Sequence, residues 1–177
     1  MSSSPERSID ASLVASIPRG KLAGRFWHQG SPNRPLLSVA APAGTDGRYH
    51  REGDPGVWYA SSKERAAWAE MLRHLKTGRL SASEVRRRIG RVYVEELDVL
   101  DLTDGYTRRR LEVSVRDLTQ DDRSVCQQIA SAARAAGFDG ILAPSAAIRG
   151  ESTLAVFPPA MAKVREEHSR IQRPPHD

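Results

Sequence analysis

The sequence predicts an α+β fold, because segments with strand character outnumber the helical ones and the helices are inserted between them. Two helical stretches are distinct: an alanine-rich one that follows Ser61, and residues 123–136, where apolar residues recur at helical spacing. At 177 residues and 19.5 kDa, the chain is long enough to bury a hydrophobic core within one domain. We therefore expect a single domain of mixed strands and helices.

The first half of the chain predicts strands around a loop, followed by a helix. The expected segments are a strand at 24–28, an apolar segment at 35–40, a glycine-marked loop at 41–55 and a strand at 56–60. Ser61 and Glu64 have the spacing of a capping box, so a helix is expected from there through Leu75. Glu70 lies on this helix.

The second half repeats this mixture. Ser81 and Glu84 have the capping spacing again and predict a shorter helix that ends at Gly90. Gly137 supplies the stop for the helix at 123–136. Further strands are expected at 92–94, 97–102, 140–143 and 153–157.

The two ends of the chain predict the limits of the folded body. Residues 1–18 are serine-rich and weakly patterned, so they are expected to form a flexible N-terminal arm. Residues 161–177 are highly charged and end with prolines, which predicts a polar C-terminal tail. The catalytic or binding domain is then expected at 19–160.

The net charge of +5 and the isoelectric point near 9.8 favour an anionic partner: nucleic acid, a phosphate-bearing small molecule or an acidic protein. The charge is spread along the chain, however. Its densest runs, at 86–88 and 108–110, are typical of solvated faces, so direct nucleic-acid binding is a secondary interpretation.

No signal-peptide core or membrane span is visible, since the first ten residues are polar and no apolar run approaches roughly 18 residues. We therefore expect a cytoplasmic protein with no membrane partner. Cys126 is the only cysteine, which excludes an internal disulfide, and its helical surroundings predict a buried packing residue. The five histidines never pair at i, i+4 on a helix, so no metal site is expected.

Three charged residues point to nucleotide chemistry. Arginine presents a planar fork of donors, and two converging arginines, Arg25 and Arg48, would suit a diphosphate. Glu70 is the best-placed carboxylate for glycosidic-bond chemistry, where negative charge stabilises a cationic sugar. Taken singly, these residues are more often surface arginines and a solvated glutamate, so only the combination carries the hypothesis.

Three further residues complete the candidate site. Phe26 and Tyr59 are placed to flank a flat ring, although aromatic residues in strands are usually core. Ser124 begins the second long helix, where free backbone N–H groups favour anions, although a plain helix cap is the commoner role. The common P-loop, dinucleotide-binding, nucleophile-elbow and zinc-protease motifs are absent.

This ordered set of residues resembles the RES-domain toxin family, which is named for its arginine, glutamate and serine. The resemblance covers roughly residues 19–158. It rests on Arg25, Gly47-Arg48-Tyr49, Tyr59-Ala60-Ser61, Ala69-Glu70 and Ser124-Val125-Cys126-Gln127, and on the phrases at 99–102 and 137–145.

The resemblance implies an ADP-ribosyltransferase-like fold and an enzyme that uses NAD as its substrate. Members are toxins of bacterial toxin–antitoxin pairs that deplete NAD, by hydrolysis or by phosphorolysis to nicotinamide and ADP-ribose 1-phosphate. An Xre-type antitoxin silences them by occluding the active site. This chain is therefore expected to cleave the nicotinamide–ribose bond with inorganic phosphate or water as acceptor, without a metal, and to form homo-oligomers or hetero-oligomers with an antitoxin.

Carried over by position, the resemblance gives each candidate a role. Arg25 and Arg48 would hold the NAD diphosphate or the incoming phosphate, Tyr59 would flank the nicotinamide, and Glu70 would serve the ribose. Ser124 would contact the cofactor or the attacking phosphate. Phe26 stands where the family usually has tyrosine and keeps a stacking face.

Two points stay open at this level. Ser145 is a rival for the serine role, since many relatives have Pro-Ser there; Ser124 is preferred for its place at a helix start. Two other functions compete with NAD depletion. One is transfer of ADP-ribose to a host protein, and the other is a non-enzymatic, basic nucleic-acid-binding module.

Overall fold

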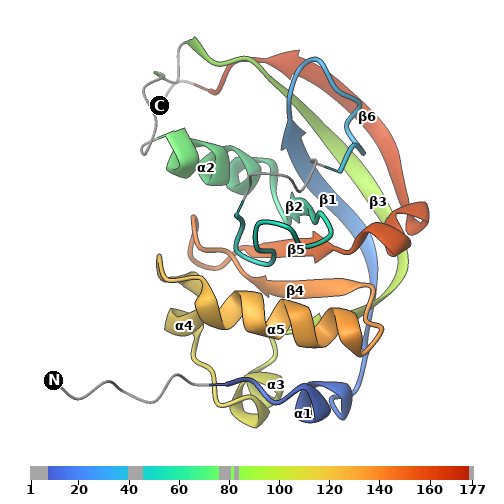
Figure 1. Ribbon diagram of the computed structural model, residues 1–177. Helices are drawn as coiled ribbons and strands as arrows, with labels where there is room; N and C mark the ends of the chain where they lie inside the picture. Colours follow the sequence, from blue (N-terminus) through green and yellow to red (C-terminus); the bar gives the residue numbers. More distant parts are fainter. Residues whose placement is uncertain (1–7, 40–45, 76–80, 82–83, 176–177) are drawn as a thin grey trace, which may run out of the picture.

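A six-stranded sheet organises the part of the chain that the computed structural model describes, namely residues 8–39, 46–75, 81 and 84–175. The strand order is β1-β2-β5-β4-β3-β6, and β1 also pairs with β3. This second pairing closes the strands from β1 to β3 into a ring, with β6 added outside it (Figure 1). The strands are β1 (Gly20–Gly30), β2 (Trp58–Ser61), β3 (Arg87–Asp101), β4 (Gly140–Pro144), β5 (Ser152–Val156) and β6 (Val164–Gln172).

The interior of the ring is one hydrophobic cluster to which all its strands contribute. Alternate residues of a strand point to the same face, so each strand sends every second side chain inward. The buried members on the strands are Phe26, Trp58, Ala60, Val92, Val94, Leu97, Val99, Leu154 and Val156. Trp58 is 1% exposed, and its indole N–H donates to the Leu36 carbonyl at 3.1 Å, which ties the segment after β1 to the ring.

Helices surround the ring. They are α1 (Ala11–Ala15), α2 (Glu64–Leu75), α3 (Gly105–Arg110), α4 (Val115–Thr119), α5 (Ser124–Ala135) and the 3₁₀ helix η2 (Pro158–Lys163). Ala160 of η2 packs into the interior cluster of the ring. Ile129 and Ala133 of α5 belong to the same buried cluster as Ile141 of β4, and Figure 1 shows α5 lying along that strand. Trp68 of α2 packs in a separate cluster with β1 and β3. None of the helices in the described ranges is long and apolar enough to cross a membrane.

Local chemistry fixes where several elements begin and end. Gly137 has φ +78°, a conformation that other residues rarely adopt, and it terminates α5. Asp104 caps α3, and Ser114 forms a capping box with Asp117 at the start of α4. At Gly140, a Cβ atom would lie 2.2 Å from the Ala155 carbonyl oxygen, so the close pairing of β4 with β5 requires glycine.

The α+β class is confirmed, and α2, α5, β1, β2, β4 and β5 all lie where the sequence predicts them. The helix predicted to end at Gly90 is wrong at its C-terminal end, because Arg87 and the residues that follow it belong to β3. Gly90 pairs with both β1 and β6, and a Cβ there would lie 2.6 Å from the His168 carbonyl oxygen, so tertiary pairing overrides the local helical signal.

Two other segments differ from expectation. Residues 35–39 form a turn at 36–37 within irregular backbone instead of an apolar strand, while Ala40 lies outside the described residues. The strands predicted at 92–94 and 97–102 are parts of one strand, β3. This strand is bent at an irregularity opposite Leu22 and Gly24, where Glu96 has φ +42°.

Both ends are more ordered than the sequence predicts. Residues 164–172, expected to lie in a polar tail, form β6 and pair with β3 from Arg87 to Val94. Its charged side chains suit an edge strand and hide the apolar alternation that reveals inner strands. Part of the expected N-terminal arm forms α1, in which Val14 is fully buried.

Candidate active site

Glu70 contacts a serine from a distant part of the chain. Glu70 lies in the middle of α2, and Ser145 is the first residue after β4. The Ser145 hydroxyl donates to Glu70 Oε1 at 3.1 Å, and it accepts the backbone N–H groups of Ala147 and Ile148 at 3.1 and 3.2 Å. A hydroxyl has a single proton, so the two accepted bonds leave that proton for the carboxylate. Ser145, which is 6% exposed, therefore orients one oxygen of Glu70.

The segment 145–151, which carries this serine, is anchored by two side-chain contacts, one with α2 and one with Ser62 just before that helix. Arg73 Nη1, one turn after Glu70, donates to the Ala146 carbonyl at 2.7 Å. At the other end, Glu151 Oε2 accepts the Ser62 hydroxyl at 2.8 Å. These two anchors keep the segment against α2, and so they preserve the contact with the Glu70 carboxylate.

Arg48 lies at the tip of a tight hairpin, defined here as residues 46–51 and called the arginine hairpin. Gly47 and His50 pair across it, with the Gly47 N–H donating to the His50 carbonyl at 2.9 Å. Arg48 Nη1 donates to the carbonyls of Leu118 and Gln120 at 3.1 and 2.8 Å. These two carbonyls engage Nη1, and the Arg48 side chain also hydrogen-bonds the buried Cys126 thiol.

Tyr59 of β2 supports the same hairpin. Its hydroxyl oxygen accepts the Tyr49 N–H at 3.0 Å and lies 2.9 Å from His50 Nδ1. Burial raises the pKa of the Tyr59 hydroxyl well above its ordinary value and lowers the pKa of His50. The phenol therefore keeps its proton, and one hydrogen bond joins it to His50 Nδ1, with the donor set by the tautomer of the imidazole. The predicted contact of the Tyr59 ring with nicotinamide stays a prediction.

The turn between α4 and α5 connects the glutamate to the arginine hairpin. Gln120 accepts from Arg48, and its neighbour Asp121 accepts from Arg73 Nη2 at 2.6 Å. Arg73 is one helical turn from Glu70, so Glu70 and Arg48 lie on the two sides of this short turn. The structure thus brings Glu70 and Arg48 into one region of the outer face. Tyr59 supports the hairpin that carries Arg48.

Ser124 lies at the start of α5, as predicted, but its contacts are local. Its backbone N–H donates to Asp122 Oδ1 at 2.9 Å, which holds the pKa of Asp122 below its ordinary value. Among the described residues, the serine that contacts Glu70 is Ser145, the rival candidate. The role of Ser124 toward a cofactor or phosphate stays a prediction.

Arg25 and Phe26 point to opposite faces of β1. The Arg25 side chain is 60% exposed, and its Nε pairs with Glu167 of β6 at 3.1 Å. Glu167 also accepts from Arg91 of β3, so Arg25 takes part in an ion-pair network over the long strands. Phe26 is 7% exposed in the interior of the ring. Neither residue contacts Glu70 or the arginine hairpin, and their predicted roles stay predictions.

Two residues that support the site were missed at the sequence level. The His28 ring stacks on Trp58, with centroids 4.6 Å apart, and its Nδ1 bonds the Tyr59 carbonyl. Gln127 of α5 contacts the arginine hairpin. His28 is a polar residue at a position where the alternation of β1 places an apolar one, which is the signal that could have found it. Gln127 lies away from the apolar stripe of α5, and its only sequence signal is its place in the motif that carries the family resemblance.

Within the described ranges, no group of histidine, cysteine, aspartate and glutamate residues could hold a metal ion. Cys126 is fully buried, as predicted, and burial raises the pKa of its thiol.

A family model described as "RES domain" matches residues 17–176. The chain belongs to the RES domain family. A Mycobacterium tuberculosis protein named "Probable NAD(+) phosphorylase Rv3189" is 52% identical to this RES domain over 165 residues, which is 93% of this chain and 79% of that protein. The crystal structure of the M. tuberculosis MbcT–MbcA toxin–antitoxin complex contains a chain with the same fold. It matches with a TM-score of 0.80 at 21% identity, over 93% of this chain and 92% of that chain.

Proposed function

We propose that this RES domain is the toxin of a bacterial toxin–antitoxin pair and depletes NAD by cleaving the bond between nicotinamide and ribose. The observation that carries the proposal is the 3.1 Å bond by which Ser145 orients Glu70, beside the arginine hairpin. A relative at 52% identity named as an NAD(+) phosphorylase supports the same activity. That name also favours phosphate over water as the acceptor.

The reaction is a displacement at the anomeric carbon of the ribose. The bond from this carbon to the nicotinamide nitrogen breaks, and its electron pair neutralises the pyridinium ring, which leaves as nicotinamide. Positive charge develops on the ribose, and the Glu70 carboxylate stabilises it electrostatically. A phosphate oxygen then bonds the anomeric carbon, giving ADP-ribose 1-phosphate. No metal is needed for these steps.

Arg48 is proposed to hold the NAD diphosphate. The guanidinium donors that the Leu118 and Gln120 carbonyls and the Cys126 thiol leave over would contact phosphate oxygens. Contacts of NAD or phosphate with Arg25, Phe26, Tyr59 and Ser124 remain part of the proposal on the strength of the family resemblance.

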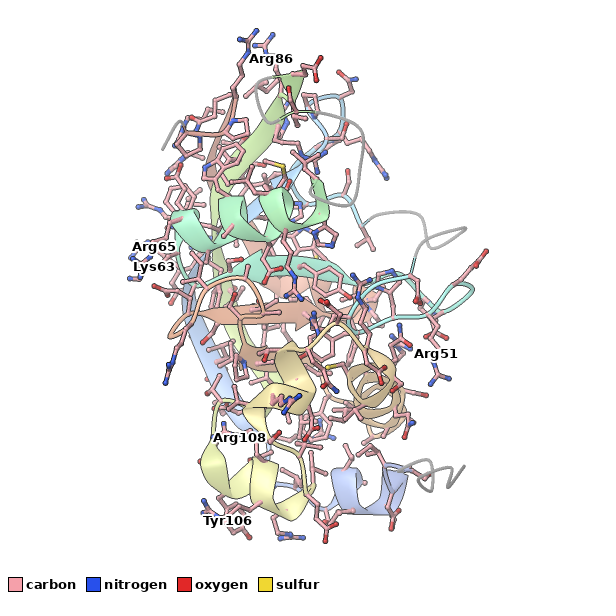
Figure 2. All side chains as sticks on the ribbon, turned by 90° about the vertical axis from the view of Figure 1, so that its left-hand side faces the viewer. Arg51, Lys63, Arg65, Arg86, Tyr106 and Arg108 are labelled. Carbon is pink, nitrogen blue, oxygen red and sulfur yellow. The ribbon has the colours of Figure 1, made fainter. Side chains whose placement is uncertain are left out.

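An antitoxin is the proposed protein partner, since the structural match is to a toxin–antitoxin complex. An Xre-type antitoxin that covers Glu70 would block access of NAD. The net charge of +5 favours an acidic antitoxin surface, which would speed association. Figure 2 shows Arg86 at the top of the molecule, far from Arg51 and from the adjacent pair Lys63 and Arg65. The cytoplasm is the proposed location, where NAD and such a partner are both present.

The test is NAD consumption by purified protein with and without inorganic phosphate, with products identified by mass. Glu70→Gln is expected to lower kcat by at least about 100-fold, because the amide carries no charge to stabilise the ribosyl cation. The matched control is Glu166→Gln on the exposed edge strand β6, expected to leave activity unchanged. Full activity of Glu70→Gln would refute the mechanism. Persistence of NAD, with label from NAD appearing on a protein, would indicate ADP-ribosyl transfer instead.

A further inference from the structure

Gln127 is the polar residue at the centre of the contact between α5 and the arginine hairpin. It is 8% exposed. Its side-chain nitrogen lies 3.0 Å from Asp46 Oδ1, 2.9 Å from the Gly47 carbonyl and 3.3 Å from the His50 carbonyl. Its side-chain oxygen accepts from Arg51 Nε at 3.4 Å. One amide thus engages both arms of the hairpin.

The chemistry of this contact requires an amide. The NH₂ group supplies two protons to three oxygen acceptors, and the amide oxygen meets a cationic donor, so both ends of the side chain are matched. A carboxylate at this position would place negative charge against three oxygens. An apolar side chain would remove this donor from the half-buried Gly47 carbonyl, which is costly, while the His50 carbonyl would keep the Gly47 N–H.

The arginine hairpin is held at a second point, and Arg48 lies between the two. Gln127 bonds Gly47 on one side of Arg48, and the Tyr59 hydroxyl bonds Tyr49 on the other. The backbone of Arg48 is therefore fixed on both sides, and Arg123 Nη1 adds a third bond, to the Asp46 carbonyl at 3.0 Å. The direction of the guanidinium depends on this fixed backbone.

We infer that Gln127 is a positioning residue for Arg48, acting through the backbone of the arginine hairpin. The inference rests on the proposed function, in which Arg48 holds the NAD diphosphate. The diphosphate is remote from the bond that breaks, so a displaced Arg48 weakens the ground state and the transition state alike. Such a loss raises KM and leaves kcat nearly unchanged.

The first experiment compares Gln127→Met, which keeps the length of the side chain, with Gln128→Met on the same helix. Gln128 accepts the Ile9 N–H at the N-terminal segment, and no hydrogen bond joins it to the hairpin within the described residues. Gln127→Met should raise KM for NAD about tenfold with kcat changed less than about threefold, whereas Gln128→Met should change neither. An unchanged KM in folded Gln127→Met overturns the inference. Should that variant fail to fold, Gln127→Asn carries the same test, because it shortens the reach of the amide.

A double-mutant cycle separates positioning from general damage. If Gln127 acts through Arg48, the tenfold rise in KM disappears when Gln127→Met is made in the Arg48→Ala background. An equal rise in both backgrounds would contradict the inference.

A second variant, Gln127→Glu, tests the inference through pH. The KM of Gln127→Glu for NAD should fall as its carboxyl becomes protonated below about pH 5, while the KM of Gln127→Met should show no such fall. Parallel pH profiles would also count against it.

Hydrogen exchange tests the hairpin without any substrate. The Gly47 N–H, which bonds the His50 carbonyl, should exchange about tenfold faster in Gln127→Met than in wild type or Gln128→Met. If wild type fails to consume NAD and this change is still seen, the proposed function fails while the positioning of Arg48 stands. If wild type consumes NAD and the exchange is unchanged, the positioning inference fails alone.

Discussion

At the residue scale, the direction of the Glu70 carboxylate depends on one hydroxyl proton. Ser145 has both acceptor sites filled by backbone N–H groups, so it cannot rotate away without breaking those bonds. A carboxylate held in this way is oriented before substrate arrives, which is the condition under which a fixed charge stabilises a transition state best.

Ser145→Ala is therefore expected to lower kcat by about 10–100-fold. A hydrogen bond to a charged group contributes about 1.5–3 kcal/mol, and each 1.36 kcal/mol corresponds to a tenfold change in rate. Ser124→Ala should change kcat by less than about twofold, because Ser124 does not contact Glu70 and its proposed contact with bound NAD would act mainly on KM. Initial rates of NAD loss decide between the serines, and a larger loss in Ser124→Ala would return the serine role to the start of α5.

At the element scale, β2 is short and depends on its neighbours. It spans Trp58–Ser61, and a single residue pair, Trp27 with Ser61, links it to β1. His28 adds a ring stacked on Trp58 and a bond from Nδ1 to the Tyr59 carbonyl. This histidine therefore stabilises the strand whose tyrosine supports the arginine hairpin.

The same histidine makes stability depend on pH. Burial lowers the pKa of His28 from 6.5 to about 4, so between these values the unfolded chain binds the proton and the folded chain does not. Its stabilisation is full above about pH 6.5 and is lost as the pH falls toward 4, by on the order of 3 kcal/mol. Thermal unfolding at pH 4.5 and 7 should show that His28→Phe, which keeps a stacked ring, loses less stability on acidification. Equal losses of stability on acidification in wild type and variant would rule out His28 as their origin. His50, whose pKa is also lowered, adds a smaller contribution of the same sign.

At the whole-molecule scale, the sheet extends beyond the ring through β6. A chain cut after Ala160 would expose the edge of β3 from Arg87 to Val94 and would remove Glu167 from between Arg25 and Arg91. We expect such a chain to aggregate or to unfold at least about 10 °C lower, since each 1 kcal/mol shifts the Tm of a domain this size by about 2–4 °C. A chain cut after Arg173 keeps β6 and should match the full protein in thermal unfolding and light scattering. Equal stability of both truncated chains would mean that β6 is dispensable.

The parts of the fold that could be predicted are those whose signals are local. The apolar stripe of α5 and the alanine-rich sequence of α2 depend on residues within a few positions of each other. The capping box predicted from Ser61 and Glu64 is wrong, because Ser61 ends β2 and α2 begins at Glu64 itself. β6 and the start of β3 depend instead on each other, since charged edge residues become a strand only when a partner strand lies alongside. Local propensity carries no information about that partner.

The candidate site also divides into residues that could be predicted from the sequence and residues that could not. Glu70 and Arg48 could be proposed from residue type, placement and family resemblance. The sequence could not show which residues orient Glu70 or hold the arginine hairpin, because those partners lie far along the chain. Ser145 and Glu70 are 75 residues apart, and Gln127 and Gly47 are 80 apart. For the serine, sequence reasoning preferred a helix start over a strand end, and only the contact itself distinguishes the two.

The bond between Ser145 and Glu70 also has a consequence for the order in which the protein is made. The glutamate leaves the ribosome 75 residues before the serine that orients it, an interval of about 4–15 s at roughly 5–20 residues per second. Gln127 of α5, which holds the arginine hairpin, is likewise synthesised 80 residues after Gly47. A nascent or prematurely terminated chain therefore carries the reactive groups without their geometry. Toxicity should begin only near the end of synthesis, which gives a co-expressed partner time to meet each molecule as it is completed.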